Sequence, residues 1–403
     1  MSSAFLHPFS PPSHPESDFI NIVRAEGSTL WDDTGKTYID GLASLWLCQI
    51  GHGRSEMVDA INAQMASLAT YNTFAPFTND ASVECADLIA EKSPFDGARV
   101  FLGCSGSEAV DTVLKLARVT HQLRGDHDRQ MIVRRTHGYH GVNFGGTSAQ
   151  GIELNREGWG DLVPHFVEVP HDDIEAMATV FSQHGERIAA VITEPLQGAG
   201  GVRLAPEGYL EQTRRLCDDN GALLIFDEVI CGFGRTGSWF GAQTFGVRPD
   251  LMSFAKGVSS GYLPLSGVIV SPEVAEVLAT VEGPLRHGYT YSGHPTCAAA
   301  GVRNIRIIED EGLVERANHI GSVIEPALAA MVADGLLTDH RGIAGIWAAE
   351  MGRDSLAARN ALLDRGVIMR PIGTCLAMCP PLVITDDELG FMLDQLAEVL
   401  ATH

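Results

Sequence analysis

The sequence predicts an α/β protein with one large, mainly parallel seven-stranded sheet flanked by helices, and a smaller α+β domain beside it. Seven apolar runs bounded by turn residues occupy the middle of the chain, as expected for strands covered on both faces. Helical patterns lie between several of these runs, which favours parallel strands joined by crossover helices. Both chain ends are of mixed character, which suggests one smaller domain built from the two termini.

The apolar runs define the expected strands, which are residues 98–104, 131–136, 163–169, 189–194, 222–229, 251–256 and 264–271. Residues 108–123 and 206–219 have the apolar spacing of amphipathic helices. Near the N-terminus, residues 31–40 have the pattern of a hairpin that turns around Asp33, Thr34 and Gly35.

The length of 403 residues, of which 45% are hydrophobic and 20% charged, suffices for such an arrangement. Residues after about 286 contain mainly helical patterns with short strands between them. We therefore expect residues 46–285 to form the large domain, and residues 1–45 and 286–403 to form the small one.

Charge and composition exclude several classes of protein. The net charge is −23, from 51 acidic and 28 basic residues, so the surface field repels nucleic acid and anionic membranes. The first fifteen residues lack a basic run followed by an apolar stretch, and no eighteen apolar residues are consecutive. We therefore expect a cytoplasmic protein. The eight cysteines lack the spacing of a zinc site and the density of a disulfide framework, so we expect no metal and cysteines that pack in the core.

Two charged residues follow apolar runs, at strand ends where ligands collect in open α/β sheets. Asp227 follows residues 222–226, and Lys256 follows residues 251–255. On its own, Asp227 also fits a helix cap or a surface turn. Buried lysines without a purpose are rare, and desolvation lowers the pKa of a lysine toward the range in which its neutral amine forms a Schiff base. Lys256 is therefore the candidate nucleophile.

Two turns after other strands add further candidate contacts. Residues 103–108 (GCSGSE) lead from a strand into an amphipathic helix, and the free N–H groups and positive end of such a helix suit a phosphate. Residues 138–141 (GYHG) place Tyr139 at another strand end. Alone, each also fits an ordinary explanation, a serine-rich helix cap or a surface tyrosine. Together with Lys256 and Asp227 they supply an amine, a carboxylate for a pyridinium nitrogen, a phosphate cup and a stacking ring for one cofactor.

These motifs resemble those of the class III aminotransferases of pyridoxal-phosphate fold type I, from about His7 to the C-terminus. The resemblance implies that Lys256 binds pyridoxal 5'-phosphate and that Asp227 contacts its ring nitrogen. It also implies a homodimer in which Tyr289 and Thr290 reach the partner's site. The other cofactor-binding residues that it implies are Ser105, Gly106 and Ser107 at the phosphate, Tyr139 and Val229 on either side of the ring, and His140 and Glu194 from the motifs at 138–141 and 194–198.

Within the class, the chain is most similar to the amine:pyruvate transaminases, or ω-transaminases. That similarity implies substrate pockets lined by Phe9, Trp46, Phe74, Tyr139, Ala199 and Arg370. Trp46 and Phe74 fit a protein core equally well, and Arg370 fits a solvated surface equally well. The chain departs from the family by being shorter between residues 148 and 169 and between residues 351 and 363, and His52 stands where a tyrosine is common.

The resemblance implies a ping-pong reaction in which an amine or ω-amino acid gives up an amino group and pyruvate, or a similar keto acid, takes it up. Lys256 acts as base and then as acid in that scheme. A diamine or β-alanine transaminase, an aminomutase and a racemase remain alternatives in the same fold. Residues 232–237 (GFGRTG) match a dinucleotide-binding turn, but they follow the fifth apolar run rather than the first, so an NAD-dependent oxidoreductase is less favoured.

Overall fold

The computed structural model describes residues 4–402 and contains the expected seven-stranded sheet. The strand order is β4 (Arg99–Gly103), β12 (Ser266–Val270), β11 (Leu251–Phe254), β10 (Leu223–Asp227), β7 (Ile188–Thr193), β5 (Met131–Arg135) and β6 (Phe166–Val169). All pairs from β11 to β6 are parallel, and β12 runs antiparallel to both of its neighbours. The prediction of a mainly parallel sheet is confirmed.

The expected strands run past the observed ones at most of their carboxyl ends. The apolar and small residues continue past the last paired residue of most strands, so the apolar runs overestimated the strand lengths. Lys256, which was expected to end a strand, instead starts the 3₁₀ helix η4 (Lys256–Val258), and its φ angle is 49°. A positive φ cannot continue a β-ladder, so the strand before it ends at Phe254.

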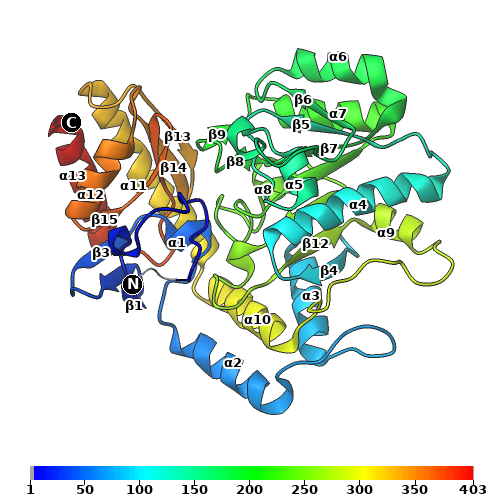
Figure 1. Ribbon diagram of the computed structural model, residues 1–403, viewed down its shortest axis with the longest axis horizontal. Helices are drawn as coiled ribbons and strands as arrows, with labels where there is room; N and C mark the ends of the chain where they lie inside the picture. The colour runs from blue at the N-terminus through cyan, green and yellow to red at the C-terminus, as the bar shows by residue number, and fades with distance from the viewer. Residues whose placement is uncertain (1–3, 403) are drawn as a thin grey trace.

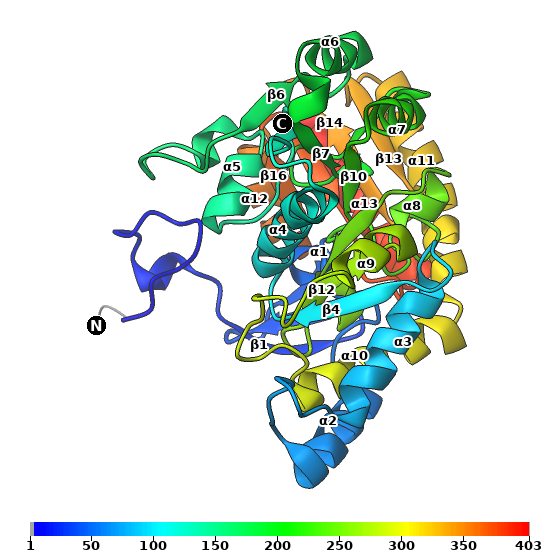
Figure 2. The same cartoon turned by 90° about the vertical axis from the view of Figure 1, so that its right-hand side faces the viewer.

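Helices cover both faces of this sheet (Figures 1 and 2). Leu223 and Ile225 of β10 pack in one apolar cluster, whereas Leu224 and Phe226 pack in another. This alternation is the period of two that a strand buried on both faces requires. The first cluster includes residues of α4 (Gly106–Arg124), α5 (Phe144–Ala149) and α9 (Pro272–Leu278), and the second includes residues of α6 (Ile174–His184) and α7 (Tyr209–Asn220).

Local signals explain the limits of the two expected helices. The Ser105 hydroxyl accepts the backbone N–H of Glu108 at 3.2 Å, and the Glu108 carboxylate accepts the N–H of Ser105 at 3.1 Å. This capping box starts α4, and Gly125 with φ 87° ends it. Gly221 ends α7 in the same way.

The two chain ends meet in a second lobe, at the left of Figure 1. β1 (Ile22–Glu26), β2 (Thr29–Asp32) and β3 (Thr37–Asp40) form an antiparallel meander that contains the expected hairpin, and β3 also pairs with β15 (Val367–Ile368). Beside them lies a second sheet of β13 (Asp339–Ile343), β14 (Ile346–Glu350), β17 (Cys375–Met378) and β16 (Arg370–Ile372), with helices α11 (Leu313–Ala333), α12 (Leu356–Asp364) and α13 (Asp386–Thr402). The domain limits at residues 45 and 285 stay a prediction.

The remaining helices connect these parts. α2 (Ser55–Leu68) and α3 (Asp80–Lys92) both pack against α10 (Pro295–Asp310). The short elements are η1 (Glu16–Asp18), α1 (Ala43–Trp46), η2 (Glu153–Asn155), η3 (Gly185–Arg187), α8 (Gly241–Thr244) and the β8–β9 hairpin (Leu196–Gln197 with Arg203–Leu204). Six of the eight cysteines are buried, as expected for core residues. Within residues 4–402, no helix has the length and apolar character needed to cross a bilayer.

Candidate active site

A cavity of about 730 Å³ lies at the carboxyl ends of the parallel strands. Asp227 is the last residue of β10, Glu194 follows β7, and Lys256 follows β11 by two residues. Parallel strands present these ends at one edge of the sheet, so the three side chains meet there. The cavity collects most of the candidate residues, namely Phe9, Trp46, Gly106, Ser107, Tyr139, His140, Glu194, Ala199, Asp227, Val229, Lys256 and Arg370.

Four candidate residues lie outside this cavity. Ser105 caps α4, and its hydroxyl is engaged in that capping box. Phe74 and Tyr289 line a separate cavity of about 1080 Å³, and the Tyr289 hydroxyl lies 3.1 Å from the backbone oxygen of Glu108 in its own chain. Thr290 is exposed. A contribution of Tyr289 and Thr290 to a partner subunit stays a prediction.

Lys256 differs from the other lysines in its surroundings. The chain has four lysines; Lys92 pairs with Glu91 and Glu309, and Lys115 contacts His287. Burial lowers the pKa of Lys256, against the opposing effect of the carboxylates of Asp227 and Glu194. Within residues 4–402 its amine makes no hydrogen bond or ion pair, so the amine is free to react with a bound molecule.

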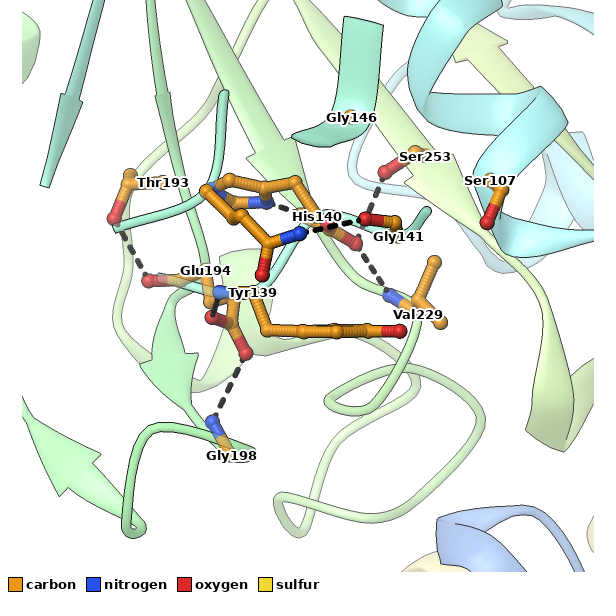
Figure 3. A network of polar contacts seen from close by, with 12 residues as sticks. Ser107, Tyr139, His140, Gly141, Gly146, Thr193, Glu194, Gly198, Val229 and Ser253 are labelled. Atoms are coloured by element: carbon orange, nitrogen blue, oxygen red, sulfur yellow. Dashed lines mark hydrogen bonds and ion pairs between the residues drawn. The ribbon is translucent and has the colours of Figure 1, made fainter. Parts of the chain in front are cut away.

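The carboxylate of Asp227 is held by three residues, His140, Ser253 and Val229, which are labelled in Figure 3. His140 Nδ1 lies 2.8 Å from one carboxylate oxygen, and the Ser253 hydroxyl and the backbone N–H of Val229 donate to the other oxygen at 3.1 and 3.2 Å. The side chains of Asp227 and His140 are 3% and 1% exposed. A buried carboxylate requires such donors, and these three fix its direction at the strand end.

Glu194 positions the loop that carries Tyr139 and His140. One of its carboxylate oxygens accepts the N–H of Tyr139 at 2.9 Å, and the other accepts the N–H of Gly198 at 2.9 Å. Figure 3 shows both contacts beside the ring of Tyr139. Burial raises the pKa of Glu194 to about 7. The Thr193 hydroxyl accepts from Arg135 at 2.8 Å, which ties this segment to β5.

The N-terminus of α4 opens into the same cavity. Gly106 and Ser107 lie in its first turn, where backbone N–H groups lack helical partners and attract anions. The loop after Tyr139 approaches closely, because the Ser107 hydroxyl accepts the N–H of Val142 at 3.0 Å. A Cβ atom on Gly141 would lie 2.6 Å from the Ser107 hydroxyl, so only glycine allows this approach.

The cavity lining also includes an apolar group of side chains and one guanidinium. Phe9, Leu45 and Trp46 line the cavity together with Arg370, the first residue of β16. Burial lowers the pKa of Arg370, and its side chain makes no hydrogen bond or ion pair with the described part of the chain. A half-buried, unpaired guanidinium is suited to bind a carboxylate through two parallel hydrogen bonds.

Some contributors to the site were missed from the sequence. Ser253 bonds to Asp227, and it faces Asp227 directly because β10 and β11 pair in that register. A polar residue within the apolar run LMSFA was the available signal. Ile152 and Asn155 also line the cavity, but they lie on a loop, where no periodic pattern reveals direction.

The glycine-rich segment 232–237 has a structural role. Arg235 in this segment is fully buried and donates to the backbone oxygens of Gly345 and Pro380 at 3.1 and 2.6 Å. The next helix, α8, has only four residues, and a dinucleotide-binding turn opens a full helix instead. The segment therefore connects the two lobes, and the dinucleotide alternative is not favoured.

Comparisons with known proteins identify one family across nearly the whole chain. A sequence model of the family "Aminotransferase class-III" matches residues 11–400. The putrescine–pyruvate aminotransferase of Pseudomonas aeruginosa is 35% identical over 92% of this chain and 88% of that protein. The ω-amino acid–pyruvate aminotransferase of Pseudomonas putida is 35% identical over 94% of this chain and 91% of that protein. The crystal structure of the ω-transaminase of Pseudomonas jessenii in complex with PMP superposes with a TM-score of 0.94 at 32% identity, over 99% of this chain and 96% of that one.

Proposed function

The chain belongs to the class-III aminotransferases, and we propose that it transfers an amino group from an amine or an ω-amino acid to pyruvate or a similar keto acid. The curated relatives named above use pyruvate as their acceptor. The observation that supports this most is the presence of the unpaired Lys256, the carboxylate of Asp227, the first turn of α4 and Arg370 in one cavity. A binding protein would have no need of a buried reactive amine there.

Members of this family depend on pyridoxal phosphate, and the cavity residues fit that group. The first turn of α4 offers free N–H groups for its phosphate, and Asp227 offers a buried anion for its ring nitrogen. Tyr139 and Val229 both line the cavity, and by the family resemblance they would lie on either side of its ring. When bound, the cofactor supplies a carbonyl group that accepts the amine and a ring that withdraws electrons.

Lys256 moves the proton in this proposal. Its amine must be neutral to take a proton from the donor carbon and charged to return it. Burial lowers the pKa of Lys256, which favours the neutral amine, while the carboxylates of Asp227 and Glu194 favour the charged form. The hydrogen bonds from His140 and Ser253 keep the carboxylate of Asp227 in position during both steps.

Arg370 distinguishes the two substrates. The cavity must accept an apolar amine beside Phe9 and Trp46 and then the carboxylate of pyruvate. Because no residue among 4–402 pairs with the Arg370 guanidinium, it has its donors free for that carboxylate. Its long side chain also allows it to retreat when an apolar group binds.

A homodimer completes the proposed site. Phe74 and the segment with Tyr289 and Thr290 lie away from the cavity of their own chain. We infer that this segment serves the cavity of the partner subunit, where Thr290 contacts the cofactor phosphate.

A donor panel tests the proposed function. The purified holoenzyme is incubated with pyruvate and, in turn, 1-phenylethylamine, putrescine and β-alanine, and the alanine formed is measured. We expect alanine to form with at least one donor. Absence of alanine with every donor, together with racemisation or amino-group migration in a single substrate, would contradict amino transfer to pyruvate.

A further inference from the structure

The turn that carries the apolar wall of the cavity has a strained backbone. Ala43, Ser44 and Trp46 have φ angles of 49°, 60° and 65°. L-residues rarely adopt positive φ because the side chain collides with the backbone, and such residues persist only where surrounding contacts hold them. Leu45 and Trp46 of this turn line the cavity that contains Lys256. The positions of Leu45 and Trp46 in the cavity therefore depend on the contacts that hold this turn.

Asp40 holds the turn through hydrogen bonds to its backbone. It is fully buried at the end of β3. One carboxylate oxygen accepts the N–H of Leu42 at 3.1 Å, and the other accepts the N–H of Ser44 at 2.7 Å. The second oxygen also accepts Nε2 of His52 at 2.9 Å. Within residues 4–402, His52 is the only side chain that hydrogen-bonds Asp40.

The backbone of His52 is itself fixed. His52 exchanges two hydrogen bonds with Gly27, at 2.9 and 3.0 Å. The glycines on either side, Gly51 and Gly53, have φ angles of 77° and 72°. A Cβ atom on Gly51 would lie 2.5 Å from Val383, and one on Gly53 would lie 2.9 Å from the backbone oxygen of Ala25. The two glycines thus allow the close packing that directs His52 toward Asp40.

We propose that His52 is a positioning residue for amine specificity. Through Asp40 it holds residues 43–46 in the strained form that presents Leu45 and Trp46 to the substrate. This inference rests on the proposed amino-transfer function. Loss of the Nε2 donor leaves Asp40 with two backbone donors only, and the turn then relaxes toward ordinary φ angles. A bulky amine that packs against Trp46 loses its contact, whereas a small amine that does not reach this wall reacts as before.

Two amide substitutions at position 52 separate the effect of losing the Nε2 hydrogen bond from the other effects of replacing the histidine. In His52→Gln the amide nitrogen can reach the position of Nε2, and in His52→Asn it is too short to do so. The holoenzymes are assayed with pyruvate and either 1-phenylethylamine or 2-aminopropane. We expect His52→Asn to raise KM for 1-phenylethylamine about tenfold, as for the loss of one hydrogen bond to a charged group, with kcat for 2-aminopropane within about twofold of the native value. The His52→Gln variant should match the native enzyme with both amines.

His319→Asn is the matched control, because His319 makes a similar pair with Asp386, at 3.1 Å, on the protein surface. This variant should behave as the native enzyme. Equal losses with both amines in His52→Asn, or no loss with either, would overturn the inference, as would a glutamine variant as impaired as the asparagine variant. If the native enzyme transfers no amino group from these two amines, from putrescine or from β-alanine, the proposed function fails instead.

If His52→Asn is unstable, the same role is tested by combining it with Ser44→Gly. Glycine adopts positive φ without a steric penalty, so Ser44→Gly removes the strain at the residue whose N–H Asp40 accepts and makes the turn less dependent on His52. The double variant His52→Asn/Ser44→Gly should fold and show a KM for 1-phenylethylamine within about threefold of Ser44→Gly alone. A tenfold difference between these two proteins would contradict the role of backbone strain.

Discussion

His140 and Asp227 form a buried pair, and substitution of His140 tests whether it positions the carboxylate of Asp227. Among residues 4–402, His140 is the only side chain that donates to one oxygen of Asp227, with its Nδ1 2.8 Å from that oxygen, and His140→Ala removes this donor. A hydrogen bond to a charged group contributes about 1.5–3 kcal/mol. If this free energy is lost from the transition state of proton transfer, the rate falls roughly 10- to 150-fold, since about 1.36 kcal/mol corresponds to a factor of ten.

The assay is the single-turnover reaction with 1-phenylethylamine, followed by the absorbance of the bound cofactor. His140→Asn is the matched control, because its amide nitrogen can take the place of Nδ1 and donate to the same oxygen. We expect the asparagine variant to lie between the native and alanine proteins. An alanine variant within about twofold of the native rate, with cofactor bound, would refute the positioning role, and an asparagine variant as slow as alanine would assign the effect to packing instead.

Three further outcomes follow from the structure. Arg370→Ala should reduce kcat/KM for pyruvate by about tenfold to a hundredfold but should barely change the single-turnover rate with 1-phenylethylamine; an equal fall in both would make Arg370 general to catalysis. Glu228, which accepts the N–H groups of Gly241 and Ala242, has its pKa raised by burial from 4.5 to about 7. Between these values the folded protein keeps a proton that the unfolded chain has lost, so its stability falls as pH rises, by about 1.4 kcal/mol per pH unit. Glu194 contributes a slope of the same sign, so Glu228→Gln should reduce the slope in urea unfolding between pH 5 and 7 by about 1.4 kcal/mol per pH unit without abolishing it, and an unchanged slope would contradict the shift. Light scattering should show a dimer, and a fully active monomer would exclude a phosphate contact from Thr290 of the partner subunit.

Local pattern predicted the parts of the site that depend on strand ends. Asp227 and Lys256 follow continuous apolar runs, and the structure places both at the same edge of the sheet. A buried strand needs apolar residues on both faces, so the run itself reveals where the strand lies. The turn before α4 was equally visible, because the capping box of Ser105 and Glu108 is a sequence signal.

Sequence patterns did not predict the features that depend on strand register or on the path of a loop. Ser253 reaches Asp227 only because β10 and β11 pair residue for residue at that position. The role of His52 depends on a bridge to Gly27 and on a carboxylate twelve residues earlier in the chain. Phe74 is apolar enough to be core, yet it is exposed in the single chain, and a second subunit lies outside what one sequence pattern describes.

Lys256 is the residue that carries the cofactor in the proposed function. The purified holoenzyme is treated with borohydride, which makes the link between lysine and cofactor permanent, and the modified peptide is identified by mass spectrometry. Of the four lysines, we expect only Lys256 to carry the pyridoxyl group, and Lys256→Ala should lose both the modification and amino transfer. A modification on Lys36, Lys92 or Lys115, or amino transfer retained by Lys256→Ala, would contradict the claim.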